Sequence, residues 1–165
     1  MSIKLKASYV IWKGLSTARK PVSLIASLGG NSATGKVLEL TLVPTAIHYE
    51  WPELSKGIKA RQQGFVYVKA IKEVIDSVCP SSCFYVQLGK GCYVQFNTRN
   101  AGQVARILRD CEPVLEDGIH ADDLYHVLRL AKATGVQMVR SMVAGDASMV
   151  PVQVWKKIEA SICKF

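Results

Sequence analysis

Residues 84–96 carry the most specific supersecondary pattern in the chain. Two five-residue runs rich in β-forming residues, Phe84–Leu88 and Cys92–Phe96, flank the loop 89–91, Gly-Lys-Gly, which is typical of a β-hairpin. With Leu88 opposite Cys92, one face of the hairpin is apolar. The other face carries Tyr85, Gln87, Tyr93 and Gln95. We therefore expect a sheet in which this hairpin has one core face and one half-polar face.

The order of the other elements indicates an α+β fold. Period-two alternation and short apolar runs predict strands at residues 3–12, 22–28 and 37–43, with 136–143 as a further strand. Helical spacing of apolar residues predicts helices at 65–78, 101–111 and 121–133, and a last helix opening at Pro151. Residues 50–63 are expected to form a loop or a weak helix. From Val37 onward this order is βαββαβ, that of a ferredoxin-like (split βαβ) core.

We accordingly predict a single two-layer domain over residues 1–165. Residues 1–35 would form an N-terminal β extension, residues 36–143 the α+β core, and residues 144–165 a C-terminal helical segment. A chain of this length buries roughly two-thirds of its unfolded surface. Neither a disulfide nor a metal ion is therefore needed to hold it together.

Charge is distributed unevenly along the chain. The formal net charge is +8, which favours polyanionic partners. Residues 1–38 contain six cations and no acid, whereas residues 109–123 contain one cation and six acids. Three interpretations stay open: the basic end binds phosphates, basic and acidic patches of neighbouring copies pair, or both segments are simply solvated.

The second strand of the hairpin resembles a known nucleic-acid motif in part. Residues 93–96, Tyr-Val-Gln-Phe, resemble the end of the third strand of RNA-recognition-motif domains, K/R-G-F/Y-G/A-F-V-x-F/Y. Residues 89–91 depart from the first half of that motif, so the likeness is an analogy confined to the hairpin and the helix after it. Independently of it, exposed tyrosines on this face would stack on bases, and the glutamines would reach base edges.

We interpret the chain first as a non-catalytic nucleic-acid-binding protein, without a preference between RNA and DNA. Cations of the N-terminal third, of the 56–61 cluster and around the hairpin would contact phosphates. The candidate phosphate contacts are Lys4, Lys6, Arg19, Lys20, Lys36, Lys56, Lys59, Arg61, Lys90, Arg99 and Arg106. The candidate base contacts are Tyr85, Gln87, Tyr93 and Gln95.

Two further functions are considered. A self-assembling structural subunit, of coat, nucleocapsid or scaffold type, would use the opposite charge patches and open β edges. A metal-dependent nuclease would use His120, Asp122 and Asp123. The two aspartates fall in the first turn of an expected helix, where carboxylates favour the helix dipole, so we rank the nuclease last and expect no catalysis.

The sequence predicts no cofactor, no metal and no membrane partner. Residues 30–37 fit the phosphate-loop pattern GxxxxGK[ST] except at Val37, and a strand follows where that motif needs a helix. The five scattered cysteines contain one loose pair, Cys79 and Cys83, which favours reduced thiols in an intracellular, reducing compartment over a zinc site. No apolar run reaches the roughly 18 residues of a membrane span.

Overall fold

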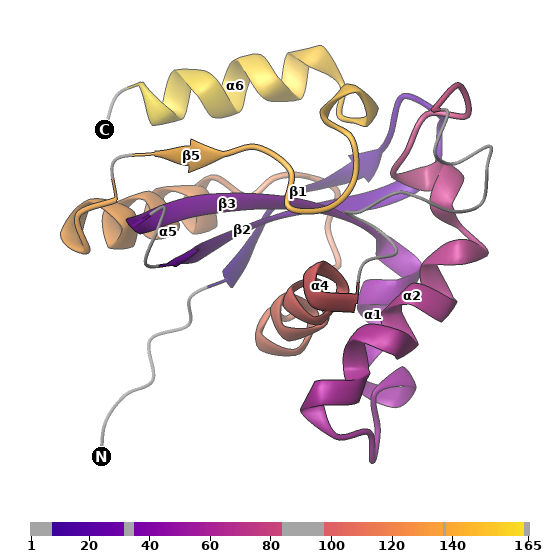
Figure 1. Cartoon of the computed structure of the whole chain (residues 1–165). Coiled ribbons are helices and arrows are strands. Elements are labelled where there is room, and N and C mark those ends of the chain that lie inside the picture. The colour runs from indigo at the N-terminus through magenta and orange to yellow at the C-terminus, as the bar shows by residue number, and fades with distance from the viewer. Residues whose placement is uncertain (1–7, 32–34, 84–97, 137, 164–165) are drawn as a thin grey trace.

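A five-stranded mixed sheet forms the centre of the structure, a computed structural model that describes residues 8–31, 35–83, 98–136 and 138–163 (Figure 1). Strands β1 (Ser8–Leu15), β2 (Pro21–Asn31) and β3 (Gly35–Pro44) form an antiparallel meander with β2 in the middle. Two short strands complete the edges: β4 (Gly118–Ile119) pairs antiparallel with β1, and β5 (Val139–Arg140) pairs parallel with β3. The sheet order is therefore β4-β1-β2-β3-β5.

Helices cover both faces of this sheet (Figure 1). One face is covered by α1 (Thr45–Leu54) and α4 (Thr98–Asp110), and α2 (Gln63–Lys72) packs against α4. The other face is covered by α5 (Ala121–Ala133) and α6 (Val152–Ile162). Three short 3₁₀ helices, η1 (Ala60–Gln62), η2 (Ile75–Ser77) and η3 (Ala147–Met149), connect these elements.

Side chains along β3 point alternately to the two faces of the sheet, and this explains why helices pack on both faces. Glu39 faces α4, where it accepts a hydrogen bond from Gln103, whereas Leu38 lines a pocket with residues of α5 and α6. Every residue from Val37 to Pro44 is buried, and a continuous apolar run of this kind is typical of a strand covered on two sides. The predicted α+β class is confirmed, and the predicted two-layer arrangement is corrected to three layers in the described part of the chain.

The ferredoxin-like arrangement stays a prediction, because the hairpin on which it depends lies at residues 84–96, outside the described residues. The strands assigned to an N-terminal extension, however, are central to the sheet. β2 pairs with both of its neighbours along most of its length. Residues that precede the expected core thus supply the middle of the hydrophobic core.

Two helices differ from the sequence prediction. Residues 45–54 form α1, although Pro52 favoured a loop, because Ile47, His48 and Trp51 bury one face of the helix and Pro52 falls in its last turn. The helix expected to run to Val78 ends at Lys72. Val74 has φ −134°, outside the helical range, and the β-branched pair at 74–75 favours this break.

The strand predicted at 136–143 is reduced to β5, because Met142 has φ +59° and no strand continues through that conformation. The core faces predicted for two other helices are confirmed. In α4, Ala101, Val104, Ala105 and Leu108 are buried, and in α5, Leu124, Val127, Leu128 and Ala131. None of the described helices combines the length and the hydropathy of a membrane-spanning segment.

Candidate nucleic-acid interface

In the part of the chain that the structure describes, a group of exposed cations lies between the end of α1 and the end of α2. Residues 55–72, called the basic segment below, contain no acid and five cations: Lys56, Lys59, Arg61, Lys69 and Lys72. All five are exposed. The segment projects away from the sheet with the helices α1 and α2 (Figure 1). Such a surface has a positive potential that no carboxylate within the segment offsets.

The helix α2 gives this segment an ordered outer face. Tyr67 and Ile71 are buried and hold the inner face of α2 in the core. Phe65, Lys69 and Lys72 recur at i, i+4 and i+7, so they share the opposite face. The Phe65 side chain is 62% exposed, which places an aromatic ring beside two cations. An exposed ring next to cations is what stacking on a nucleic-acid base requires.

Exposed acids border the basic segment at both ends: Glu53 at its N-terminal side and Glu73, directly after Lys72, at its C-terminal side. Glu53 Oε2 is 3.3 Å from Lys56 Nζ, and both side chains are about three-quarters exposed, at 77% and 74% respectively. An ion pair this exposed contributes at most about 1 kcal/mol and is weakened by salt. Lys56 therefore stays available to a stronger anion.

The cations predicted for the N-terminal third do not form one patch in the described structure. Arg19 and Lys20 lie in the β1–β2 turn, where Lys20 Nζ is 3.7 Å from Asp76 Oδ2. Lys36 lies at the start of β3, at the opposite end of β2. Because β2 rises roughly 3.3 Å per residue, these two ends are roughly 30 Å apart. Lys4 and Lys6 lie outside the described residues.

The candidate residues of the hairpin, Tyr85, Gln87, Lys90, Tyr93 and Gln95, also lie outside the described residues. Arg99 belongs to α4, and its side chain is likewise outside the description. Arg106 is exposed on the same helix. The structure thus brings together Lys56, Lys59 and Arg61 of the predicted set. It adds Phe65, and also Lys69 and Lys72, which the helical pattern of residues 65–78 placed on the polar face of that helix.

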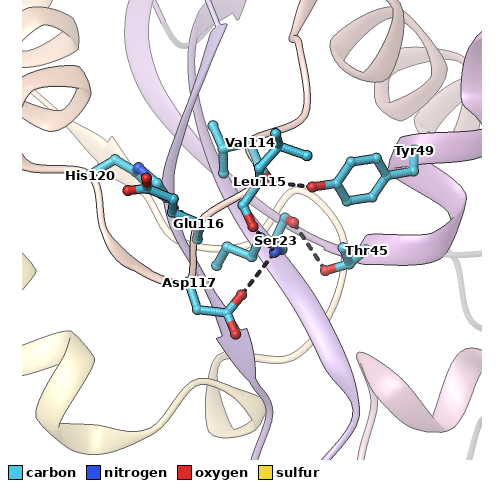
Figure 2. Close-up of polar contacts among 9 residues, drawn as sticks. Ser23, Thr45, Tyr49, Val114, Leu115, Glu116, Asp117 and His120 are labelled. Atoms are coloured by element: carbon cyan, nitrogen blue, oxygen red, sulfur yellow. Dashed lines mark hydrogen bonds and ion pairs between the residues drawn. The ribbon is translucent and has the colours of Figure 1, made fainter.

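The acidic segment 109–123 is tied to the sheet through a lysine that the charge count assigned to the basic end (Figure 2). Lys13 Nζ donates to the carbonyl oxygen of Leu115 at 2.7 Å and lies 2.8 Å from Asp117 Oδ1. The bond to Asp117 raises the pKa of Lys13 above 10.5. The hydroxyl of Tyr49 donates to the carbonyl of Val114 nearby. Lys13 is therefore an internal partner of the acidic segment rather than part of a binding surface.

A buried carboxylate was missed by the sequence analysis. Glu39 on β3 has a side chain only 3% exposed. Gln103 Nε2 donates to its Oε2 at 2.5 Å, and Arg140 Nη1 on β5 lies 3.7 Å from its Oε1. Glu39 therefore connects α4, β3 and β5. Two neighbours on the same sheet face, Ser27 and Thr41, have buried hydroxyls with no hydrogen-bond partner among the described residues.

A second buried ionisable group lies on α1. His48 is 1% exposed, and its Nε2 is 2.9 Å from the carbonyl oxygen of Cys111. Its Nδ1 has no hydrogen-bond partner within the described ranges. Burial lowers the pKa of His48 below its ordinary 6.5, so the ring is neutral near pH 7. The contact joins α1 to the end of α4, which is a structural role.

The residues considered for metal chemistry do not converge. Asp122 and Asp123 occupy the first turn of α5, and His120 Nε2 lies 3.2 Å from the carbonyl of Glu116. Among the described residues, no three His, Cys, Asp or Glu side chains form a group able to hold a metal ion. Within the described ranges, Cys79, Cys83, Cys111 and Cys163 form no disulfide with one another.

Comparisons with protein-family models, with curated proteins and with solved structures found no match. The functional proposal therefore depends on the basic segment and on the charge distribution around it.

Proposed function

We propose that this protein binds nucleic acid without catalysing a reaction, and that the basic segment is its main contact surface. The observation that carries the proposal is the run of five exposed cations with no acid across residues 55–72. Phosphate contacts of lysine and arginine supply most of the affinity of sequence-independent nucleic-acid binding. A cluster on one ordered segment supports such binding better than the cations dispersed over both ends of the sheet.

The exposed ring of Phe65 favours single strands over duplexes. Bases of a single strand are free to stack on an aromatic side chain, whereas paired bases in a duplex are not. Each stacked base contributes about 1–3 kcal/mol. The tyrosines of the predicted hairpin would add further stacking surfaces, and their contribution stays a prediction.

The proposal is tested by fluorescence anisotropy with labelled single-stranded and duplex oligonucleotides over a range of salt concentrations. The variant Lys59→Gln/Lys69→Gln removes two cations from the basic segment. We expect it to weaken single-strand binding and to reduce the slope of log K against log salt by about 1.4, since each phosphate contact contributes about 0.7. The matched control, Lys156→Gln/Lys157→Gln, removes two exposed cations from α6 and should leave both quantities unchanged.

A separate variant tests stacking. Phe65→Ala should weaken single-strand binding by about 1–3 kcal/mol while the salt slope stays constant, because a ring makes no phosphate contact. Absence of binding at low salt, or equal effects of the α2 and α6 substitutions, would reject the basic segment as the contact surface.

The acidic segment supports self-assembly as a second candidate. Leu115 is 83% exposed and is flanked by Glu112, Glu116 and Asp117. An exposed apolar side chain with acids near it in the sequence complements the basic segment of a neighbouring copy, whose Phe65 is also exposed. Size-exclusion chromatography with light scattering tests this, together with the absorbance ratio of the purified protein. A monomer at high concentration and low salt would exclude assembly, and a nucleic-acid-like absorbance ratio would favour the first candidate.

A further inference from the structure

The connection between α1 and α2 exposes apolar side chains among the cations of the basic segment. Leu54 and Ile58 are 36% and 37% exposed, and Phe65 is 62% exposed. Lys59 and Arg61 lie between Ile58 and Phe65 in the chain, and both are exposed. Residues 54–65, called the tip below, therefore combine exposed apolar side chains with exposed cations.

Hydrogen bonds hold the tip together as one ordered unit. The N–H of Ile58 donates to the carbonyl oxygen of Ser55 at 3.1 Å and closes the turn that follows α1. Gln63 Nε2, in the first turn of α2, donates to the carbonyl oxygen of Ile58 at 3.3 Å. Behind the tip, the buried rings of Trp51 and Tyr67 join the two helices. The exposed side chains thus extend from a fixed backbone.

The cations of the tip are available to an external anion. Neither Lys59 nor Arg61 forms an ion pair within the described ranges. The acid next to the tip, Glu53, has Lys56 as its partner at 3.3 Å. The basic segment also projects away from the sheet with α1 and α2 (Figure 1), so an extended flat surface can approach it.

Nucleic-acid binding does not account for the aliphatic side chains of the tip. Leu54 and Ile58 offer a base no aromatic ring to stack on. Exposed apolar side chains beside cations match the chemistry of an anionic bilayer instead. Apolar groups enter the boundary between headgroups and acyl chains, and lysine and arginine are attracted to the negative surface.

We propose that the tip is a peripheral docking site for an anionic phospholipid bilayer. Leu54, Ile58 and Phe65 enter the bilayer surface to a depth of about 5–10 Å, and Lys59 and Arg61 contact the headgroups. Such a contact lies on the membrane and needs no spanning helix, which is consistent with the described helices. This activity goes beyond nucleic-acid binding and does not depend on it.

The experiment is co-sedimentation of the full-length protein with vesicles over a range of salt concentrations. One set of vesicles contains phosphatidylcholine alone, and the other contains phosphatidylcholine mixed with phosphatidylserine. We expect saturable binding to the anionic vesicles at low salt, and binding at least tenfold weaker to the neutral ones. The reason is that each lysine or arginine near an anionic surface contributes about fivefold in affinity.

Two variants distinguish insertion of the tip from attraction by charge alone. Leu54→Gln/Ile58→Gln keeps the net charge and should weaken binding to anionic vesicles about tenfold, while oligonucleotide binding stays unchanged. Ile58→Trp adds a side chain that favours membrane interfaces and should strengthen vesicle binding, so it tests insertion even if the double variant unfolds. The matched control Val152→Gln replaces an apolar side chain of α6 that is 58% exposed and should have no effect. Thermal unfolding verifies that each variant folds.

Each outcome decides the proposal. Preference for anionic vesicles, weakened by the double substitution or strengthened by Ile58→Trp and unaffected by Val152→Gln, supports it. No binding to anionic vesicles at low salt, equal effects of the tip and α6 substitutions, or binding that no tip substitution alters would overturn it. Oligonucleotide titrations of the same proteins measure nucleic-acid binding separately. A protein that binds oligonucleotides but not vesicles would refute only the bilayer contact, and the reverse result would refute only nucleic-acid binding.

Discussion

The position of Gly29 beneath the buried Glu39 gives a quantitative prediction. Gly29 lies on β2 with ordinary extended backbone, yet a methyl group there would overlap Cδ and Oε2 of Glu39 and lie 3.0 Å from its Oε1. Gly29→Ala must therefore displace the carboxylate. The displaced group loses the hydrogen bond from Gln103, which is 2.5 Å long and, as a charge-assisted bond, contributes about 1.5–3 kcal/mol.

Two smaller effects modify this loss. The ion pair with Arg140, at 3.7 Å and with the arginine side chain 48% exposed, contributes at most about 1 kcal/mol. Replacing glycine by alanine in the unfolded chain favours folding by about 0.4–1 kcal/mol. We therefore expect Gly29→Ala to lower the free energy of unfolding by about 0.5–3.5 kcal/mol.

A double-mutant cycle with Glu39→Ala isolates the cause. Once the carboxylate is absent, Gly29→Ala meets no obstruction and should raise the free energy of unfolding by about 0.4–1 kcal/mol. The coupling energy between the two positions is then about 1.5–4 kcal/mol, measured by urea unfolding of the four proteins. A coupling energy below about 0.5 kcal/mol would refute the assigned contact between Gly29 and Glu39.

Three further predictions concern other buried positions. At Gly145, φ is +82° and an added methyl group would lie 2.7 Å from Leu42 Cβ, whereas at Gly135 φ is +75° and the space is open. Gly145→Ala should therefore destabilise the protein by about 1–3 kcal/mol more than Gly135→Ala. Equal urea midpoints of the two variants would contradict this steric difference. Because burial lowers the pKa of His48, unfolding takes up a proton, and the free energy of unfolding should fall below pH 6.5 by up to about 1.4 kcal/mol per pH unit. His48→Gln should lose this component in urea titrations at several pH values, and an unchanged profile would argue against it. Thr41→Val removes a buried hydroxyl without a partner and should stabilise by about 1 kcal/mol in thermal unfolding, so a loss of stability would point to an undetected partner.

The sequence was most informative where an amphipathic pattern continued over several turns. The helix at 121–133 was predicted with its observed bounds, because Leu124, Val127 and Leu128 repeat at helical spacing and Gly135 closes it with φ +75°. The helix at 45–54 was missed because Pro52 is a strong local signal. Burial of Trp51 against Tyr67, with ring centroids 6.4 Å apart, outweighs the effect of Pro52. This burial depends on a residue of α2, which the sequence pattern of residues 45–54 does not reveal.

The candidate site was predictable in charge but not in geometry. Lys56, Lys59 and Arg61 are close in sequence, so their clustering follows from the chain itself. Lys13 and Lys20 belong to an acid-free stretch, yet each finds its partner, Asp117 or Asp76, more than fifty residues away. Net charge over a segment cannot separate a cation with a distant partner from one available to a ligand.

The sheet order also has a consequence for biosynthesis. The meander β1–β2–β3 is complete in the chain at Pro44, but β4 and β5 begin at Gly118 and Val139. At about 5–20 residues per second, synthesis leaves roughly 4–15 s during which both outer strands of the meander lack their final neighbours, and roughly 5–20 s before β5 is made. Unpaired strand edges are sites of aggregation and of chaperone recognition. Protease protection of nascent chains stalled before and after residue 140 would show at which chain length β5 pairs with β3. That length is also the one beyond which the β3 edge no longer promotes aggregation between nascent chains.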